Sequence, residues 1–516
     1  MYIQSSPSPN YLHKNLPVQT GMNIAEWNKF RHIVDPIDPT LIDSLQYGFC
    51  MGIDREHVVN IPHTNHKSAH AEFQVIDDFI YKHYQSGAIL GPYTTNPFPV
   101  KMYPSPLQVA TSSSNKKRAV IDMSYPDSTS INSAIPKDWG CIPGFDGEFR
   151  LPTHDKMCER VMSLEHPVMA LTDLSAYYMQ LPSDLNDAPY LCFAWRDELW
   201  VHRRLPFGCR SSCLHAQRVT DAVCAIHRHE STNHVEGYVD DFGQIDDETV
   251  ADSAYSEFHW LLALLGFIVT VLKCERPGYL RVFLGLLYNM LARTLELPQE
   301  KLDRALALID EWLHSDTVGK HKLEQLAGFL NHISSVVHAG RPFSAFIYDL
   351  IQSKTFPVVI DDELKLDLAM WKDFLTSSFT RVCSMKVSLD LPTDIIVAIA
   401  VKHNTCILKI GSCFYGYKIQ ASWSIPPHVM HFVAVWLITK YHIQAIAGQI
   451  VAISVPTLNA VKLINRSTSV CKQIRPLVRE TWLRQAQADT RIKAVLGSAN
   501  VTWLYEHFVY FETVDI

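Results

Sequence analysis

The sequence predicts a multidomain protein of mixed α+β class. Its 516 residues, at about 150 residues per domain, correspond to roughly three or four folding units. Apolar residues make up 47% of the chain and charged residues 19%, which supplies several hydrophobic cores and excludes disorder for most of its length. Short apolar runs alternate with helical patterns over 167–285, whereas the hydrophobic period is helical from Pro298 onward.

The N-terminal part divides into a leader and an extension. Residues 1–25 are rich in Ser, Pro and Asn and show no sustained period, so we expect a flexible leader. The leader lacks the apolar core of a secretory signal, so secretion is not supported. Residues 26–99 form an N-terminal extension that leads into the next domain. One amphipathic helix is expected there, over 69–85, because its apolar residues recur at helical spacing.

Composition limits the compartment in which the protein acts. The twelve cysteines contain no C-x-x-C pair, so we interpret them as reduced thiols of a cytoplasmic or nuclear protein. The apolar stretches at 261–272 and 432–455 are too short or are interrupted by polar residues, so no membrane span is expected. The net charge of −7 argues against indiscriminate polyanion binding, but a cleft with local cations could still hold nucleic acid.

Two acidic segments carry the strongest chemical signal. Asp240 and Asp241 interrupt an apolar run, which places both at a predicted hairpin tip. Adjacent acids in a turn are usually solvated turn formers. Asp173, however, ends a second strand-like run over 168–172, and neighbouring strands would bring three carboxylates together. Their mutual repulsion is relieved by divalent cations, so we expect two Mg²⁺ ions about 4 Å apart, which Mn²⁺ can replace.

Five motifs follow one another in a fixed order. They are Asp173 with an aromatic residue five positions on, Leu205-Pro206-Phe207-Gly208, Tyr238-Val239-Asp240-Asp241, Lys273-Cys274-Glu275 and Phe283-Leu284-Gly285. In this order they resemble a reverse transcriptase motif by motif, over residues 23–350. The stretches 117–126, 130–132 and 329–342 resemble specifically the polymerases of DIRS-like, tyrosine-recombinase retrotransposons.

The resemblance implies roles for the acids and for two residues beside them. Asp173, Asp240 and Asp241 match the metal-binding acids. Tyr178 matches the aromatic residue that crowds the sugar 2′ position and selects deoxynucleotides, because its ring would clash with a 2′-hydroxyl. Lys273 matches a position proposed to protonate the leaving pyrophosphate, although a surface lysine that ends a strand is an equally good interpretation.

Other matched residues would surround the incoming nucleotide. Arg118, with Lys117 beside it, matches the finger residue that holds the triphosphate through a permanently charged guanidinium. Phe207 and Gly208 match the turn beneath the nucleotide and the template base. We therefore expect all four to bind nucleotide.

One further motif matches the family, and one segment differs from it. Phe283, Leu284 and Gly285 match the turn that grips the primer end. The family usually carries a lysine after Ser-Pro-Leu-x-Val, whereas this chain has none over 105–111. A phosphate contact is then missing, or it is supplied by Lys116 or by the neighbouring Lys117.

The resemblance implies a right-hand polymerase followed by a ribonuclease H-like α/β domain. The expected boundaries are 1–25 for the leader, 26–99 for the extension, 100–297 for fingers and palm, 298–352 for the helical thumb, 353–384 for a linker and 385–516 for the ribonuclease H-like domain.

The last domain is expected to be inactive as a nuclease. A ribonuclease H uses four carboxylates and two metal ions, and our alignment places Ala400, His431, Pro456 and Leu504 at the four acidic positions. A shifted alignment could use Asp390 or Asp394, but a single acid would not bind two cations. The domain could be a platform that steers the duplex or a decaying copy.

The sequence therefore predicts an RNA-directed DNA polymerase, a nucleotidyltransferase that uses an RNA template, a DNA primer and deoxynucleoside triphosphates. No recombinase region accompanies it, so insertion would need a separate protein. A rival interpretation is a domesticated polymerase fold that binds RNA or a protein partner without catalysis. An active ribonuclease H is a third interpretation and the least favoured.

Overall fold

The computed structural model describes most of the chain. The described residues are 20–59, 63–111, 115–142, 144, 149, 151–231, 233–352, 356–377, 382–385, 397–466, 472–497 and 510–516. They form two compact units, which divide between Leu284 and Gly285. Both units combine helices with sheets, so the predicted α+β class is confirmed.

Short helices open the N-terminal unit. They are α1 (Ile24–Lys29), α2 (Arg31–Val34), α3 (Leu41–Tyr47), α4 (Lys67–Ala71) and α5 (Phe73–Gln85). The side chain of Asn23 caps α1 by accepting a 3.4 Å hydrogen bond from the backbone N–H of Glu26. The single helix expected over 69–85 is in fact two, because the backbone leaves helical geometry at Glu72 (φ −114°, ψ 42°).

A four-stranded antiparallel sheet lies at the centre of this unit, and we call it the central sheet. Its strands, in the order β7-β8-β4-β9, are β7 (Val235–Tyr238), β8 (Asp241–Asp247), β4 (Pro167–Asp173) and β9 (Glu275–Gly278). β4 pairs with β8 on one side and β9 on the other. Because β4 is inside the sheet, nearly all of its residues are buried, which explains its continuous apolar run.

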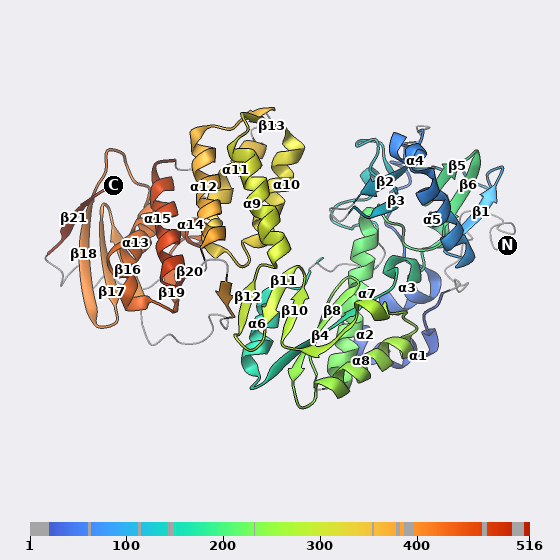
Figure 1. Ribbon diagram of the computed structural model, residues 1–516, viewed down its shortest axis with the longest axis horizontal. Coiled ribbons are helices and arrows are strands. Elements are labelled where there is room, and N and C mark those ends of the chain that lie inside the picture. The colour runs from blue at the N-terminus through green and yellow to red at the C-terminus, as the bar shows by residue number, and fades with distance from the viewer. Residues whose placement is uncertain are drawn as a thin grey trace. The chain divides into compact units, whose positions relative to one another are not determined.

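Three helices pack beside the central sheet (Figure 1). They are α6 (His154–Ser163), α7 (Arg210–Glu230) and α8 (Ala251–Leu265). α7 begins two residues after the Leu205-Pro206-Phe207-Gly208 motif and continues to Glu230. α8 ends at Gly266, whose φ of 94° favours glycine. A Cβ on Gly266 would lie 2.4 Å from the carbonyl oxygen of Gly21, so the close approach also requires glycine.

The rest of the N-terminal unit consists of small sheets and short 3₁₀ helices. Its strands are β1 (Ile89–Tyr93), β2 (Leu107–Thr111), β3 (Lys117–Ile121), β5 (Cys192–Trp195), β6 (Glu198–His202) and β10 (Leu280–Phe283), and its 3₁₀ helices are η3 (Ile131–Ala134), η4 (Tyr177–Gln180), η5 (Leu185–Asp187) and η6 (Val271–Lys273). β2 and β3 form an antiparallel hairpin, and β1, β6 and β5 form a sheet in that order. α5 packs against both β1 and β3.

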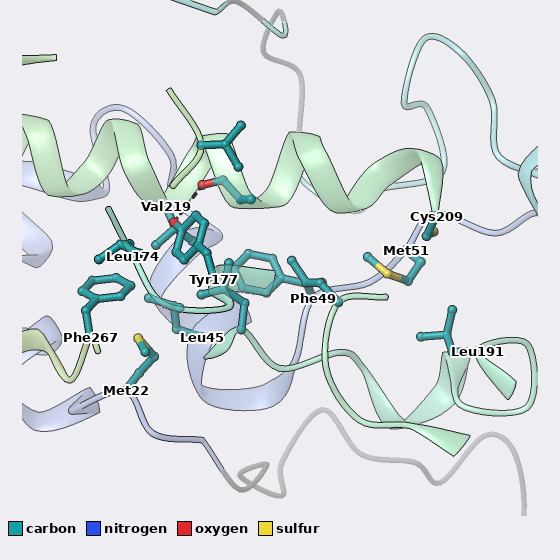
Figure 2. Close-up of a cluster of buried hydrophobic side chains, with 14 of the residues drawn as sticks. Met22, Leu45, Phe49, Met51, Leu174, Tyr177, Leu191, Cys209, Val219 and Phe267 are labelled. Atoms are coloured by element: carbon teal, nitrogen blue, oxygen red, sulfur yellow. Dashed lines mark hydrogen bonds between the residues drawn. The ribbon is translucent and has the colours of Figure 1, made fainter. Parts of the chain in front are cut away.

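One hydrophobic core joins these elements. It draws buried side chains from α1 and α3, from the 3₁₀ helix η4 and from α7 and α8. Figure 2 shows Tyr177 among Leu174, Val219 and Phe267, with its ring centroid 6.1 Å from that of Phe267. The segment that carries Tyr178 is therefore anchored from within the core.

The C-terminal unit starts with a helical region. Its elements are β11 (Leu286–Asn289), β12 (Thr294–Glu296), α9 (Gln299–Leu313), β13 (Thr317–Val318), α10 (Lys320–Ile333), η7 (His338–Gly340), α11 (Pro342–Gln352), β14 (Val358–Val359), α12 (Asp362–Thr376) and β15 (Val382–Ser384). Leu302, Ala305, Ile309 and Trp312 form the buried stripe of α9. The helical period from Pro298 onward therefore corresponds to packed helices.

An α/β region follows in the same unit. Its elements are β16 (Val397–Lys402), β17 (Thr405–Ile410), β18 (Cys413–Gln420), α13 (Pro427–Tyr441), η8 (Ile443–Ile446), β19 (Ile450–Val455), α14 (Leu458–Arg466), η9 (Lys472–Ile474), α15 (Arg475–Gln487), β20 (Arg491–Leu496) and β21 (Glu512–Asp515). β16, β17 and β18 pair antiparallel, whereas β19 and β20 pair in parallel. α13 is buried on almost all sides, which matches its unbroken apolar sequence.

The composition led us to expect reduced cysteines and no membrane span, and the described residues can be compared with both expectations. None of the cysteines that the structure describes forms a disulfide bond. Among the described helices, none combines the length and the apolar character needed to cross a bilayer.

Candidate active site

The two acidic segments meet at one end of the central sheet. β7 and β8 form a hairpin whose turn is Val239 and Asp240, and Asp241 is the first residue of β8. In the antiparallel ladder between β4 and β8, Asp173 is the direct partner of Asp241. The backbone N–H of Leu174 also donates a 2.9 Å hydrogen bond to the carbonyl oxygen of Asp240. Strand pairing thus brings Asp173 together with the acid pair Asp240 and Asp241, which is distant from it in sequence.

Burial and the proximity of the three carboxylates raise the pKa values of Asp240 and Asp241. Burial, followed by the charges of Asp240 and Asp173, raises the pKa of Asp241 to about 6. Burial and the charge of Asp173 also raise the pKa of Asp240. Like charges placed directly opposite in a sheet destabilise it. The metal-free site therefore carries an electrostatic strain that a cation would relieve.

Two basic side chains offset part of this charge. Lys273, in η6, places its Nζ 2.6 Å from Oδ2 of Asp173. This hydrogen bond raises the pKa of Lys273. Lys273 and Arg118 both act to lower the pKa of Asp240. The other oxygen of Asp173, Oδ1, is buried and accepts no hydrogen bond from the described residues.

The three aspartates offer oxygen atoms that could bind a metal ion, but their side chains do not surround a single point. Within the described ranges, no group of three or more His, Cys, Asp or Glu side chains is arranged to hold a metal ion. Mg²⁺ prefers carboxylate oxygens, and the three aspartates supply only these. The buried Oδ1 of Asp173 and the raised pKa of Asp241 both fit a position for a cation. The residues present therefore fit Mg²⁺ in chemistry and in charge.

A cavity of about 760 Å³ opens beside the acids. One wall comes from the central sheet and its neighbours, and the facing wall comes from α5 and the β2–β3 hairpin. The lining includes Asp173, Tyr178, Phe207, Asp240 and Lys273 on the first wall and Asp78, Lys82, Lys116, Lys117 and Arg118 on the second. This volume is in the range of pockets that bind small molecules, and both walls carry acidic and basic side chains, with most of the cations on the second wall.

Tyr178 is held in this cavity by three neighbours. It follows Tyr177 in η4, whose first turn is preceded by Ala176 with a φ of 45°. The ring of Tyr178 lies 4.7 Å from the ring of Phe207, centroid to centroid. Its hydroxyl also bonds the thiol of Cys213, and burial raises its pKa. The ring is therefore held in place as part of the cavity lining.

The turn that contains Phe207 and Gly208 is tied to β3 and to η3. Gly208 has a φ of 103°, and a Cβ there would lie 2.1 Å from the carbonyl oxygen of Ile121. The side chain of Asn132 donates a 2.7 Å hydrogen bond to the Gly208 carbonyl and accepts one of 2.8 Å from the Arg210 N–H. Only glycine permits this approach, and Asn132 fixes the start of α7.

The cations of the second wall differ in their partners. The Nζ of Lys117 lies 2.5 Å from Oε1 of Glu72, so its ammonium holds the hairpin to the α4–α5 junction. Arg118 extends from β3 into the cavity. Lys82, in the last turn of α5, lines the same cavity and was missed by the sequence reasoning. Its signal was weak, because a lysine near a helix C-terminus is common.

The three predicted primer-grip residues follow each other at the end of β10. Phe283 is buried, and its ring packs close to Gly243 of β8. Leu284 and Gly285 form the turn after the strand, with φ values of 48° and 75°. Gly285 belongs to the C-terminal unit, where Lys301 and His332 surround it. The structure thus connects Phe283 to the central sheet.

The positions aligned with ribonuclease H acids lie in the C-terminal α/β region. Ala400 is a buried residue of β16, His431 is a buried residue of α13, and Pro456 follows β19. Nδ1 of His431 lies 2.8 Å from the carbonyl oxygen of Pro427. Leu504, Asp390 and Asp394 lie outside the described residues.

No protein-family model matches the chain, and no curated protein matches it either. Among solved structures, the foamy viral protease-reverse transcriptase dRH in complex with double-stranded DNA is similar, with a TM-score of 0.51 and 15% sequence identity over 95% of this chain and 81% of that chain. The foamy viral protease-reverse transcriptase in complex with an RNA/DNA hybrid has the same score and identity, over 95% of this chain and 62% of that chain. At such low identity the likeness shows the fold alone, which is that of a reverse transcriptase.

Proposed function

We propose that the chain is an RNA-directed DNA polymerase that adds deoxynucleotides to a primer. The observation that carries the proposal is the pairing of Asp173 with Asp241 across the β4–β8 ladder, beside a cavity that offers cations on its facing wall. The reverse transcriptase fold supports the proposal. The foamy viral structures contain double-stranded DNA and an RNA/DNA hybrid, and we infer the same partners here: an RNA template, a DNA primer and deoxynucleoside triphosphates.

Asp173, Asp240 and Asp241 would hold two Mg²⁺ ions, or Mn²⁺ in their place. When bound, such ions supply Lewis acidity at the attacking and leaving oxygens of a phosphoryl transfer. Arg118 and Lys82 orient the triphosphate by charge, and the ring of Tyr178 excludes a 2′-hydroxyl by contact. Lys273 is the general acid for pyrophosphate. Its Nζ, which lies 2.6 Å from Oδ2 of Asp173, would donate the proton to the leaving group.

The finer parts of the assignment also remain proposals. On the motifs at 117–132 and 329–342, we assign the polymerase to a DIRS-like retrotransposon, acting in the cytoplasm or nucleus with a separately encoded recombinase. With alanine, histidine, proline and leucine at the four acidic positions, we infer that the ribonuclease H-like domain cleaves no RNA.

Primer extension with the purified protein tests the proposal. We expect incorporation of deoxynucleotides on a primed RNA template that requires Mg²⁺ or Mn²⁺ and is absent in EDTA. The same preparation should leave the RNA strand of a hybrid uncut.

A non-catalytic scaffold is the second candidate. The Lys273–Asp173 ion pair favours it, because a basic group occupies an oxygen that a metal would need. The absence of lysine over 105–111 favours it as well. A scaffold would bind the RNA–DNA duplex with similar affinity whether or not Mg²⁺ is present, and it would extend no primer.

A further inference from the structure

The turn that carries the catalytic acids has an unusual backbone. Val239, between Tyr238 and Asp240, has a φ of 54°. β-Branched residues rarely adopt this conformation, so the surrounding structure must hold it. Val239 is also 7% exposed, which means that its backbone polar groups cannot rely on water. Its hydrogen-bond partners therefore decide where Asp240 and Asp241 point.

Two side chains of α7 provide these partners. The backbone N–H of Val239 donates to Oε1 of Gln217 at 2.8 Å, and its carbonyl oxygen accepts from Oγ1 of Thr220 at 2.5 Å. The amide nitrogen of Gln217 also donates to the carbonyl oxygen of Gly237 at 2.9 Å. Gln217 and Thr220 are 1% and 0% exposed, and their i, i+3 spacing puts them on one helix face.

The chemistry at 217 requires an amide. The N–H of Val239 needs an acceptor and the carbonyl oxygen of Gly237 needs a donor. The amide side chain of Gln217 provides both. A carboxylate would accept but could not donate, and a thioether of the same length could do neither well. Thr220 adds a steric element, because a Cβ on Gly237 would lie 2.3 Å from its methyl group.

The same helix face also holds the neighbour of the sugar-selecting residue. The hydroxyl of Tyr177, whose ring is seen in Figure 2, lies 3.0 Å from the carbonyl oxygen of Ala216 and 3.1 Å from Oγ1 of Thr220. The single hydroxyl proton of Thr220 serves Val239, so the one proton of the Tyr177 hydroxyl is shared between the Ala216 carbonyl oxygen and Oγ1 of Thr220. One face of α7 is thus bonded both to the acidic turn and to the 3₁₀ helix that presents Tyr178.

We propose that Gln217 and Thr220 are positioning residues that set the acidic turn in its metal-binding arrangement. This inference rests on the proposed function, since it assigns the acids to metal. It goes beyond the matched motifs, which do not include either residue. Neither side chain touches substrate, because both are buried beneath the turn.

The experiment compares Gln217→Met and Thr220→Val with Gln217→Glu, Thr220→Ser and wild type. Gln244→Met is the matched control, because Gln244 is a buried amide of β8 that bonds Ala254 rather than the turn. Mn²⁺ binding to the full chain is measured by electron paramagnetic resonance. Single-nucleotide incorporation gives kcat and KM, and a gel shift gives the Kd for template–primer.

We expect Gln217→Met to weaken Mn²⁺ binding and lower kcat, each about tenfold, with the Kd for template–primer unchanged. Gln217→Glu should lose at least as much as Gln217→Met, because its carboxylate would be buried against Asp221 and the Gly237 carbonyl oxygen, to which the amide nitrogen of Gln217 donates. Thr220→Ser should retain wild-type values, whereas Thr220→Val should resemble Gln217→Met. If Gln217→Met does not fold, the Thr220 pair and Gln217→Glu decide the question.

Two results would overturn the inference. One is wild-type Mn²⁺ affinity and kcat in both Gln217→Met and Thr220→Val. The other is an equal loss in Gln244→Met. If the wild-type protein binds Mn²⁺ but incorporates no nucleotide, the proposed function fails, while the Mn²⁺ affinities of the variants still support or refute the inference.

Discussion

At the scale of single residues, the acids of the central sheet oppose folding in the absence of metal. Asp241 faces Asp173 across the ladder, and burial with the neighbouring charges raises its pKa to about 6. An acid whose pKa is raised in the folded state gives stability that is present below its unfolded pKa and is lost as pH rises through about 6. The folded protein therefore bears an electrostatic cost at neutral pH, which a cation bound by these acids would offset.

Replacing this carboxylate should stabilise the metal-free protein. We predict that Asp241→Asn increases the free energy of unfolding by about 0.5 kcal/mol at neutral pH, since the site is partly exposed and screened. Urea unfolding in EDTA measures the change. Asp247→Asn, at the other end of β8, is the control and should destabilise, because Asp247 accepts hydrogen bonds from Thr249 and His166. A lower unfolding free energy for Asp241→Asn would contradict the electrostatic account.

A second residue-scale prediction concerns sugar selection. The ring of Tyr178 packs on Phe207 within the cavity, so its removal should create space for a 2′-hydroxyl. Tyr178→Ala should reduce discrimination against ribonucleotides by at least about tenfold, whereas Tyr178→Phe should keep it. The ratio of kcat/KM for a matched ribonucleotide and deoxynucleotide measures this. Unchanged discrimination in Tyr178→Ala would remove the assignment.

At the scale of secondary-structure elements, we expect α5 to supply the phosphate-binding lysine that the β2 strand lacks. No lysine occurs over 105–111, and Lys117 is paired with Glu72. Lys82 of α5 lines the same cavity as Arg118. A flexible ammonium in this position is suited to contact phosphate as a point charge.

We therefore predict that Lys82→Gln raises the KM for deoxynucleoside triphosphate about fivefold with kcat nearly unchanged. Steady-state incorporation at varied nucleotide concentration measures the effect, and Lys82→Arg should restore most of the affinity. Lys67→Gln, which removes an exposed lysine of α4 outside the cavity lining, is the control. An equal KM for Lys82→Gln and wild type would show that α5 makes no phosphate contact.

The elements differ in how far the sequence predicts them. Local patterns predicted β4 with Asp173 at its end, the β7–β8 hairpin and the buried stripe of α9, because each depends on residues close in sequence. The break at Glu72 was missed, since it depends on packing that a periodic pattern does not encode. Element existence is more predictable than element boundaries for this reason.

The sequence predicted which residues form the candidate site, but it did not predict how these residues contact one another. Motif order indicated Asp173, Asp240 and Asp241, but the register that makes Asp173 the partner of Asp241 is a nonlocal property of the ladder. The ion pair between Lys117 and Glu72 is also nonlocal, so the sequence did not predict it. In the structure, Lys117, which we expected to bind nucleotide, contacts Glu72. Gln217 and Thr220 could have been suspected as polar residues in a helix that packs on a sheet.

At the scale of the whole molecule, buried histidines make folding sensitive to acid. Burial lowers the pKa of His202 to about 3 and that of His83 to about 4. Neither ring nitrogen of His202 has a hydrogen-bond partner among the described residues. Between the folded and unfolded pKa values, the unfolded chain binds more protons, so stability falls as pH decreases below about 6.5.

We predict that each of these histidines costs about 2 kcal/mol of stability between about pH 6.5 and about pH 5. His202→Leu should remove its share of this loss, so the variant gains stability relative to wild type on acidification. Urea unfolding at both pH values measures the difference. His229→Leu replaces an exposed histidine and serves as the control. An acid dependence identical to that of wild type in His202→Leu would refute the contribution of this residue.

The account as a whole depends on the three aspartates acting as a polymerase centre. The most direct measurement is single-nucleotide incorporation on a primed RNA template with Mg²⁺ by wild type, Asp240→Asn and Asp247→Asn. We predict that Asp240→Asn loses incorporation by at least about a thousandfold while still binding the duplex, and that Asp247→Asn keeps it. Incorporation at the wild-type rate by Asp240→Asn would contradict the account.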